Sequence, residues 1–160
     1  MSADPPRRRW RTLLGVLRLG GPYVAFLALR RVVSLETLAR WAWRTPRIAP
    51  RDRDNEARLV REATKLRHLF DRKDRYCLPR SLALYRALSR AGASPQLFVG
   101  FRKQAGGVDG HAWVAIDGHP VGEAEHLMRS LTPTCVFGVE GAATQLGGGM
   151  DPAETSGRDR

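Results

Sequence analysis

The sequence predicts an α+β domain in which helices come first and a small antiparallel sheet follows. Apolar residues recur at helical spacing from residue 10 to residue 91. From residue 94 the period changes to two, because apolar and polar side chains alternate in SPQLFVGFR. Asp117-Gly118 then separates two apolar stretches, which is a strong hairpin signal. Helices followed by a run of strands are typical of the α+β class.

The first fifty residues predict a helical extension. Residues 1–9 are polar and basic and are expected to form a flexible terminus. Residues 10–45 show helical spacing, with a break expected at Gly20-Gly21-Pro22 and an N-cap expected at Ser34. The extension ends in a proline-containing linker near residue 50. Its apolar stripe fits either a helical hairpin packed on the main domain or a docking surface for a partner or a membrane.

The main domain is expected over residues 51–140. A helix is predicted over 54–70, and a second one begins at Cys77 and runs to about Ala91. Pro79 fits the first turn of that second helix, where a missing N–H does no harm. Strands are predicted over 94–102 and 111–116, with 119–126 returning as a third strand or an extended arm and 135–139 forming a short edge strand. Residues 141–160 are rich in glycine and predict a disordered tail.

Composition narrows the class of protein. The formal net charge of +11 favours anionic partners, but the arginines are scattered and no nucleic-acid motif is present, so nucleic acid is not expected and membrane association stays open. Two cysteines are too few for a disulfide framework and lack metal-ligand spacing, so we expect no metal and no cofactor. The apolar run over 13–29 contains a charge and is too short for a membrane span. We therefore expect a cytoplasmic protein with free thiols.

Cys77 stands where a helix begins, and this position suits a nucleophile. Unpaired N–H groups at a helix start favour a nearby anion such as a thiolate, and Arg75 and Arg80 act in the same direction. The alternative is a buried, inert cysteine. His111 begins the strand HAWVAI after a glycine-rich loop, where it is either a structural histidine or faces a cleft. Taken together, the two residues match the Cys–His pair of papain-like and transglutaminase-like folds.

The turn at Asp117-Gly118 decides which carboxylate can orient His111. A two-residue turn would place Glu123 on the same face as Ala112, away from His111. A three-residue loop with a bulge would place Glu123 and Glu125 on the His111 face. Pro120 cannot donate a ladder hydrogen bond and is compatible with the bulged form.

Three stretches together carry a resemblance. YCLPRSLALYRALSRAG, LFVGF and HAWVAIDGHPVGE resemble the leader peptidase of lasso-peptide biosynthesis, the protease half of the B protein, in the transglutaminase-like (papain-like) superfamily. The resemblance covers about residues 50–137, and the helical extension also resembles one that such proteins carry. It implies a Cys-bearing helix packed on a small antiparallel sheet, with Cys77 as nucleophile and His111 as base. The family's acid, usually aspartate, falls at Glu123, with Glu125 in reserve.

The resemblance also implies a biological role. Such hydrolases remove the leader from a ribosomally synthesised precursor peptide and need no cofactor. The implied partners are the precursor's leader region, a leader-recognition protein, which we expect to be a separate polypeptide, and an ATP-dependent macrolactam cyclase. Two alternatives remain open: acyl transfer to an amine instead of water, and a non-enzymatic basic adaptor that binds a membrane or nucleic acid.

The remaining candidate side chains have weaker cases. Trp113 fits either a cleft wall or the core, and Cys135 has no catalytic case. His119 and His126 fit surface positions.

Overall fold

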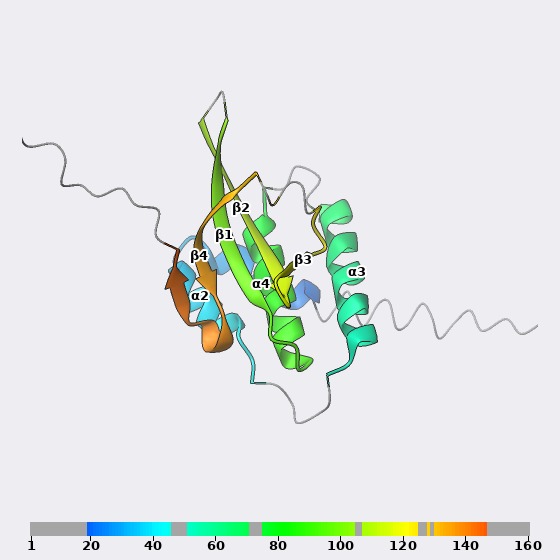
Figure 1. The fold of residues 1–160 in the computed structure, drawn as a ribbon. Coiled ribbons are helices and arrows are strands. Elements are labelled where there is room, and N and C mark those ends of the chain that lie inside the picture. The colour runs from blue at the N-terminus through cyan, green and yellow to red at the C-terminus, as the bar shows by residue number, and fades with distance from the viewer. Residues whose placement is uncertain are drawn as a thin grey trace, which may run out of the picture.

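A computed structural model describes residues 19–45, 51–70, 75–104, 107–124, 128 and 130–146. In these ranges, helices come first and a sheet follows, which confirms the predicted α+β class (Figure 1). The chain is helical over residues 19–29. The labelled helices are α2 (Leu35–Ala42), α3 (Arg53–Phe70) and α4 (Cys77–Arg90).

The sheet is antiparallel, with the strand order β3-β2-β1-β4-β5. Its strands are β1 (Gln96–Gln104), β2 (Gly107–Ile116), β3 (His119–Val121), β4 (Thr132–Phe137) and β5 (Ala143–Gln145). Helix α4 lies against β1 and β2, and α3 lies beyond the β3 edge (Figure 1). The stretch predicted as an edge strand belongs to β4, which instead lies between β1 and β5, because the chain after the 3-10 turn Val139–Gly141 adds one more strand.

One apolar core joins the helices to the sheet. Its buried members come from the helix over residues 19–29, from α2, α3 and α4, and from β1, β2 and β4. They include Leu19, Phe26, Leu38, Leu59, Leu82, Leu88, Leu97, Val114 and Phe137. The N-terminal helices therefore share a core with the Cys-bearing helix. The predicted N-cap of α2 is confirmed, because the Ser34 hydroxyl accepts a hydrogen bond from the Thr37 N–H at 3.3 Å.

The expected helix break at Gly20-Gly21-Pro22 is wrong. The chain stays helical through these residues. A proline disfavours the helical conformation of the residue before it mainly through a clash with that residue's Cβ and N–H, and Gly21 has no Cβ. Burial of Leu19 and Tyr23 in the core favours the helix on either side of this tripeptide.

One further stretch differs from the sequence-based picture. Residues 143–145, which fall in the expected tail, form β5 and pair with β4. Residues 147–160 lie outside the described part of the chain.

The hairpin between β2 and β3 has a two-residue turn, because Ile116 pairs with His119. Asp117 and Gly118 have φ values of 53° and 81°, as the turn type with two positive φ angles requires.

Candidate active site

Cys77 is the first residue of α4. Tyr76 is the N-cap, and its side chain makes no cap hydrogen bond to the main-chain N–H groups of the first turn, in which Cys77 stands. The positive end of the helix dipole favours negative charge at this position. Cys77 is a free cysteine and is partly buried.

Ser81 ties the first turn of α4 to the strand that carries the histidine. Its buried hydroxyl donates a hydrogen bond of 2.8 Å to the carbonyl of Ala112. Ser81 is four residues after Cys77, so the two side chains lie on the same face of the helix. The bond therefore fixes the cysteine's end of α4 next to the residue that follows His111.

His111 lies on β2, beyond the end of the β2–β3 ladder. It pairs with Gly100 of β1, whereas the last β3 partner of β2 is at Val114. The imidazole is 14% exposed, and its Nε2 lies 3.8 Å from Oε1 of Glu123, which is longer than a hydrogen bond. Nε2 has no hydrogen-bond partner among the described residues.

The His111 ring is charged at neutral pH. Burial lowers its pKa, but the interactions with the Cys77 side chain and with Glu123 outweigh burial and raise the pKa to about 9. Since Nε2 faces Glu123, Nδ1 is the ring nitrogen left for the thiol. The geometry thus gathers a thiol, an imidazole and a carboxylate from three separate elements.

Glu123 reaches this site in spite of the two-residue turn. For a two-residue turn, the expected register placed Glu123 on the face of Ala112, because it extended the β2–β3 ladder past residue 121, and that extension is wrong. The ladder ends at Val121, and Gly122 has a φ of 74°, which turns the chain out of the strand direction. Glu125 and His126 lie outside the described residues, so the reserve carboxylate has no place in this description.

Two arginines that the sequence did not connect with Glu123 bind its carboxylate. The Arg80 guanidinium donates to Oε1 at 2.5 Å, and Arg67 of α3 donates to Oε2 at 3.0 Å. The side chains of Arg80 and Glu123 are each only 6% exposed. Burial raises the pKa of Glu123, but His111, Arg80 and Arg67 together hold it below its ordinary value. Glu123 is therefore an anion at neutral pH.

The position of Arg80 in the sequence already connected it with the candidate active site. Arg80 follows Cys77 by three residues, one helical turn, and was assigned to the thiolate. In the structure its guanidinium instead binds the carboxylate that faces the histidine. Arg75, the other flanking arginine, is exposed.

Aromatic side chains pack beside the histidine. Trp113 is buried and stacks on Phe98 with ring centroids 5.3 Å apart, and the His111 ring lies 6.4 Å from the Trp113 ring at an interplanar angle of 19°. Trp113 is therefore a core side chain that also contacts the site.

His119 is exposed at the turn. Cys135 packs against the main core, and burial raises the pKa of its thiol.

A small cavity adjoins Glu123. The cavity lined by Arg67, Arg80, Ser81 and Glu123 has a volume of about 10 Å³, close to the space of a single water. Within the described ranges, no group of three or more His, Cys, Asp or Glu side chains has the arrangement of a metal site.

Residues 22–136 match the sequence model of the Transglutaminase-like superfamily. The chain belongs to the transglutaminase-like superfamily. The match spans Cys77, His111 and Glu123, and it begins inside the first helix, so it also takes in part of the N-terminal extension. Searches of the curated proteins and of the solved structures gave no match. A transglutaminase-like domain is consistent with cysteine peptidase or acyltransferase chemistry.

Proposed function

We propose that this transglutaminase-like protein is a cysteine peptidase that removes the leader from a lasso-type precursor peptide. Cys77 is the nucleophile, His111 the acid–base group and Glu123 the group that orients the imidazole. The observation that carries the proposal is the juxtaposition of these three side chains, with His111 3.8 Å from Glu123 and interacting with Cys77.

The proposed mechanism has two steps. The Cys77 sulfur, held as a thiolate beside the imidazolium, attacks the carbonyl carbon at the leader–core junction. N–H groups at the start of α4 stabilise the oxyanion, and His111 protonates the departing core amine as the C–N bond breaks. Water then attacks the thioester, His111 takes its proton, and the leader leaves as a carboxylic acid while Cys77 regains its sulfur charge.

The assignment to lasso precursors rests on the motifs. The stretches YCLPRS and HAWV, which resemble the leader peptidases, place their Cys and His at the two positions that interact in the fold. The proposal includes a separate leader-recognition protein and an ATP-dependent cyclase as partners. It also places the enzyme in the cytoplasm, where thiols remain reduced. No helix in the described ranges is both long enough and apolar enough to cross a membrane.

A first experiment measures the reactivity of Cys77 with Cys135 as an internal control. Iodoacetamide alkylation followed by peptide mapping should label Cys77 faster than Cys135 below neutral pH, and His111→Ala should remove this difference. Equal labelling of both thiols in the native enzyme and in His111→Ala would contradict the catalytic pair.

A second experiment tests the reaction itself. A lasso precursor peptide, with its leader-recognition protein, is incubated with the native enzyme, Cys77→Ala and Cys135→Ala, and the products are weighed by mass spectrometry. We expect a leader with a free carboxylate from the native enzyme and from Cys135→Ala, and none from Cys77→Ala. With glycine amide added, a leader carrying the amine would instead indicate acyl transfer, and cleavage by Cys77→Ala would refute the proposal.

The structure changes how the N-terminal extension can be tested as a docking surface. Deleting residues 1–45 would remove Leu19, Phe26 and Leu38 from the main core and would unfold the domain, so a loss of complex formation would be uninformative. Exposed side chains of the same segment, Val24 and Trp41, are suitable substitutions because they do not contribute to the core.

A further inference from the structure

A second pocket lies on α4, away from the candidate active site. It has a volume of about 360 Å³ and lies between the first helix, α3 and the second half of α4. Pro22, Leu59, Ala83, Ala87 and Ala91 form an aliphatic wall, and Asn55, Arg86 and Arg90 are its polar members. Arg86 follows Cys77 by nine residues, roughly 14 Å along a helix. The pocket is therefore separate from the cysteine.

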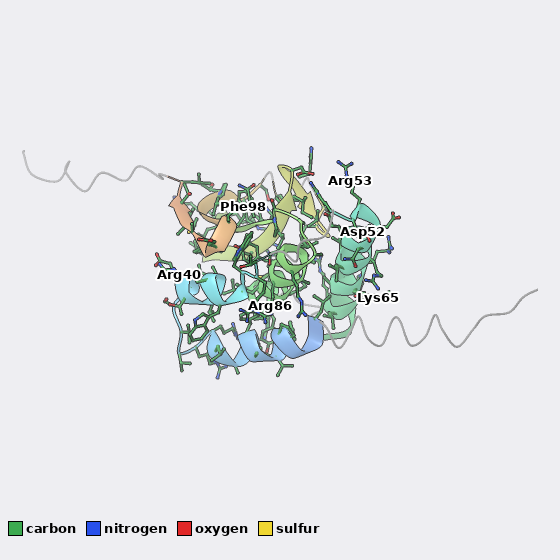
Figure 2. All side chains as sticks on the ribbon, turned by 90° about the horizontal axis from the view of Figure 1, so that it is seen from below. Arg40, Asp52, Arg53, Lys65, Arg86 and Phe98 are labelled. Carbon is green, nitrogen blue, oxygen red and sulfur yellow. The ribbon has the colours of Figure 1, made fainter. Side chains whose placement is uncertain are left out.

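Three arginines gather beside this pocket. Arg86 and Arg90 are one helical turn apart on α4. Ser89 lies between these two arginines in the chain, and its hydroxyl accepts a hydrogen bond from the main-chain N–H of Arg44. Burial lowers the pKa of Arg86, and repulsion from Arg44 and Arg90 lowers it further. Figure 2 shows Arg86 among the first helix, α2 and α4. This cluster of like charges costs folding free energy as long as no anion is bound.

No carboxylate compensates this cluster within the described part of the chain. None lines the pocket, and Glu56, the acid next to Asn55, is bound by Arg51 at 2.7 Å. Arg86 donates one N–H to the carbonyl of Trp41 at 2.9 Å, which fixes the guanidinium in place. A guanidinium has five N–H donors, so Arg86 retains donors for a ligand.

We propose that this pocket binds an acidic peptide segment of a partner protein, which inserts one aliphatic side chain. The aliphatic wall suits a leucine-sized side chain, and the arginines suit carboxylates on either side of it. The wall contains no aromatic ring on which a base could stack, which disfavours nucleic acid. The partner's carboxylates relieve the repulsion among Arg44, Arg86 and Arg90.

The test uses a fluorescein-labelled peptide, Glu-Asp-Leu-Glu-Asp, in anisotropy titrations with the full chain. Matched peptides carry Gln and Asn in place of the acids, or Ser in place of Leu. We expect the acidic leucine peptide to bind at least about tenfold more tightly than either control. Arg86→Gln with Arg90→Gln should weaken binding about tenfold or more, and Ala87→Leu should weaken it by filling the pocket without changing the charge.

The matched control is Arg61→Gln with Lys65→Gln, which removes the same two charges from exposed positions on α3 that do not line the pocket. It should bind the peptide like the native protein. An equal loss in Arg61→Gln with Lys65→Gln would show attraction to net charge only and would overturn the proposal. A single-stranded oligonucleotide that binds more tightly, with the same dependence on Arg86, would also overturn it. All variants should keep the native circular dichroism spectrum and the native alkylation rate of Cys77.

Discussion

Arg80 is the residue whose removal tests the site most sharply. Its guanidinium lies 2.5 Å from Oε1 of Glu123, the oxygen that also faces His111 at 3.8 Å. Arg80→Met keeps most of the side chain's apolar length but removes its charge and its donors. After this substitution, the buried Glu123 carboxylate has lost one of its two arginine partners.

The magnitude follows from burial. Removing one partner of a buried ion pair costs about 3–5 kcal/mol, because the other charge stays desolvated. Arg67 remains at 3.0 Å on Oε2 and is 27% exposed, so it compensates part of this loss. We therefore expect Arg80→Met to lower the free energy of unfolding by about 2–4 kcal/mol. The double variant Arg80→Met with Glu123→Gln no longer contains the buried charge. We expect its loss of unfolding free energy to be at least about 1 kcal/mol smaller than the sum of the losses in the two single variants.

The assay is urea unfolding followed by tryptophan fluorescence. The matched control is Arg102→Met, because the Arg102–Asp109 pair is also within hydrogen-bond distance, at 2.8 Å, but more exposed. That variant should lose less than about 1 kcal/mol. Arg80→Met should also begin to unfold at a higher pH on the acid side. The low pKa of Glu123 contributes stability above its ordinary value of 4.5, and this contribution is lost as pH falls through the folded-state pKa, which the substitution raises.

A catalytic readout separates positioning from stability. Under conditions where Arg80→Met stays folded, its rate of precursor cleavage should fall, and the acid limb of its pH–rate profile should move upward. Loss of stability equal to that of Arg102→Met, together with an unchanged profile, would refute the claim that Arg80 holds the orienting carboxylate.

Three further predictions concern other contacts. Because the pKa of His111 is raised from 6.5 to about 9, its charge stabilises the fold fully below pH 6.5, and this contribution is lost as pH rises through 9. After a discount for solvent screening, we expect the free energy of unfolding to fall by about 1–2 kcal/mol over this range. Urea unfolding at the two pH extremes should show this difference, and His111→Gln should abolish it. Ser81→Ala removes the donor to a buried carbonyl and should cost about 1–3 kcal/mol, with slower alkylation of the cysteine, whereas Ser81→Thr should retain both properties. Gly141→Ala should lower the melting temperature, because Gly141 has a φ of 68° and a Cβ there would lie 2.6 Å from the main-chain nitrogen of Arg40; Gly20→Ala, in an open helical position, should instead raise it. An unchanged melting temperature in Gly141→Ala would contradict the close approach.

Local features of the fold could be predicted because local sequence determines them. The Ser34 cap and the start of α4 at Cys77 depend on residues within one helical turn. The turn at Asp117-Gly118 needs two positive φ angles, which Asp and Gly adopt readily. This dipeptide was therefore enough to predict the position of the turn. The α+β class followed from the change of apolar period near residue 94.

Features that depend on tertiary contact were missed. The helix through Gly20-Gly21-Pro22 is favoured by burial of its neighbours, which local propensity does not register. β5 forms because β4 offers it an edge to pair with, although its residues read as part of a polar tail. The two-residue turn was expected to place Glu123 away from His111, because that expectation extended a ladder that in fact ends two residues before Glu123.

By itself, the sequence determined that a cysteine begins a helix, that a histidine stands on a following strand and that helices precede an antiparallel sheet. Only the tertiary structure decided which groups surround the carboxylate. Arg67 and Arg80 reach Glu123 across 56 and 43 residues of chain. Contacts over such separations depend on how α3, α4 and the end of β3 pack together, and a pattern read within a single element contains no information about that packing.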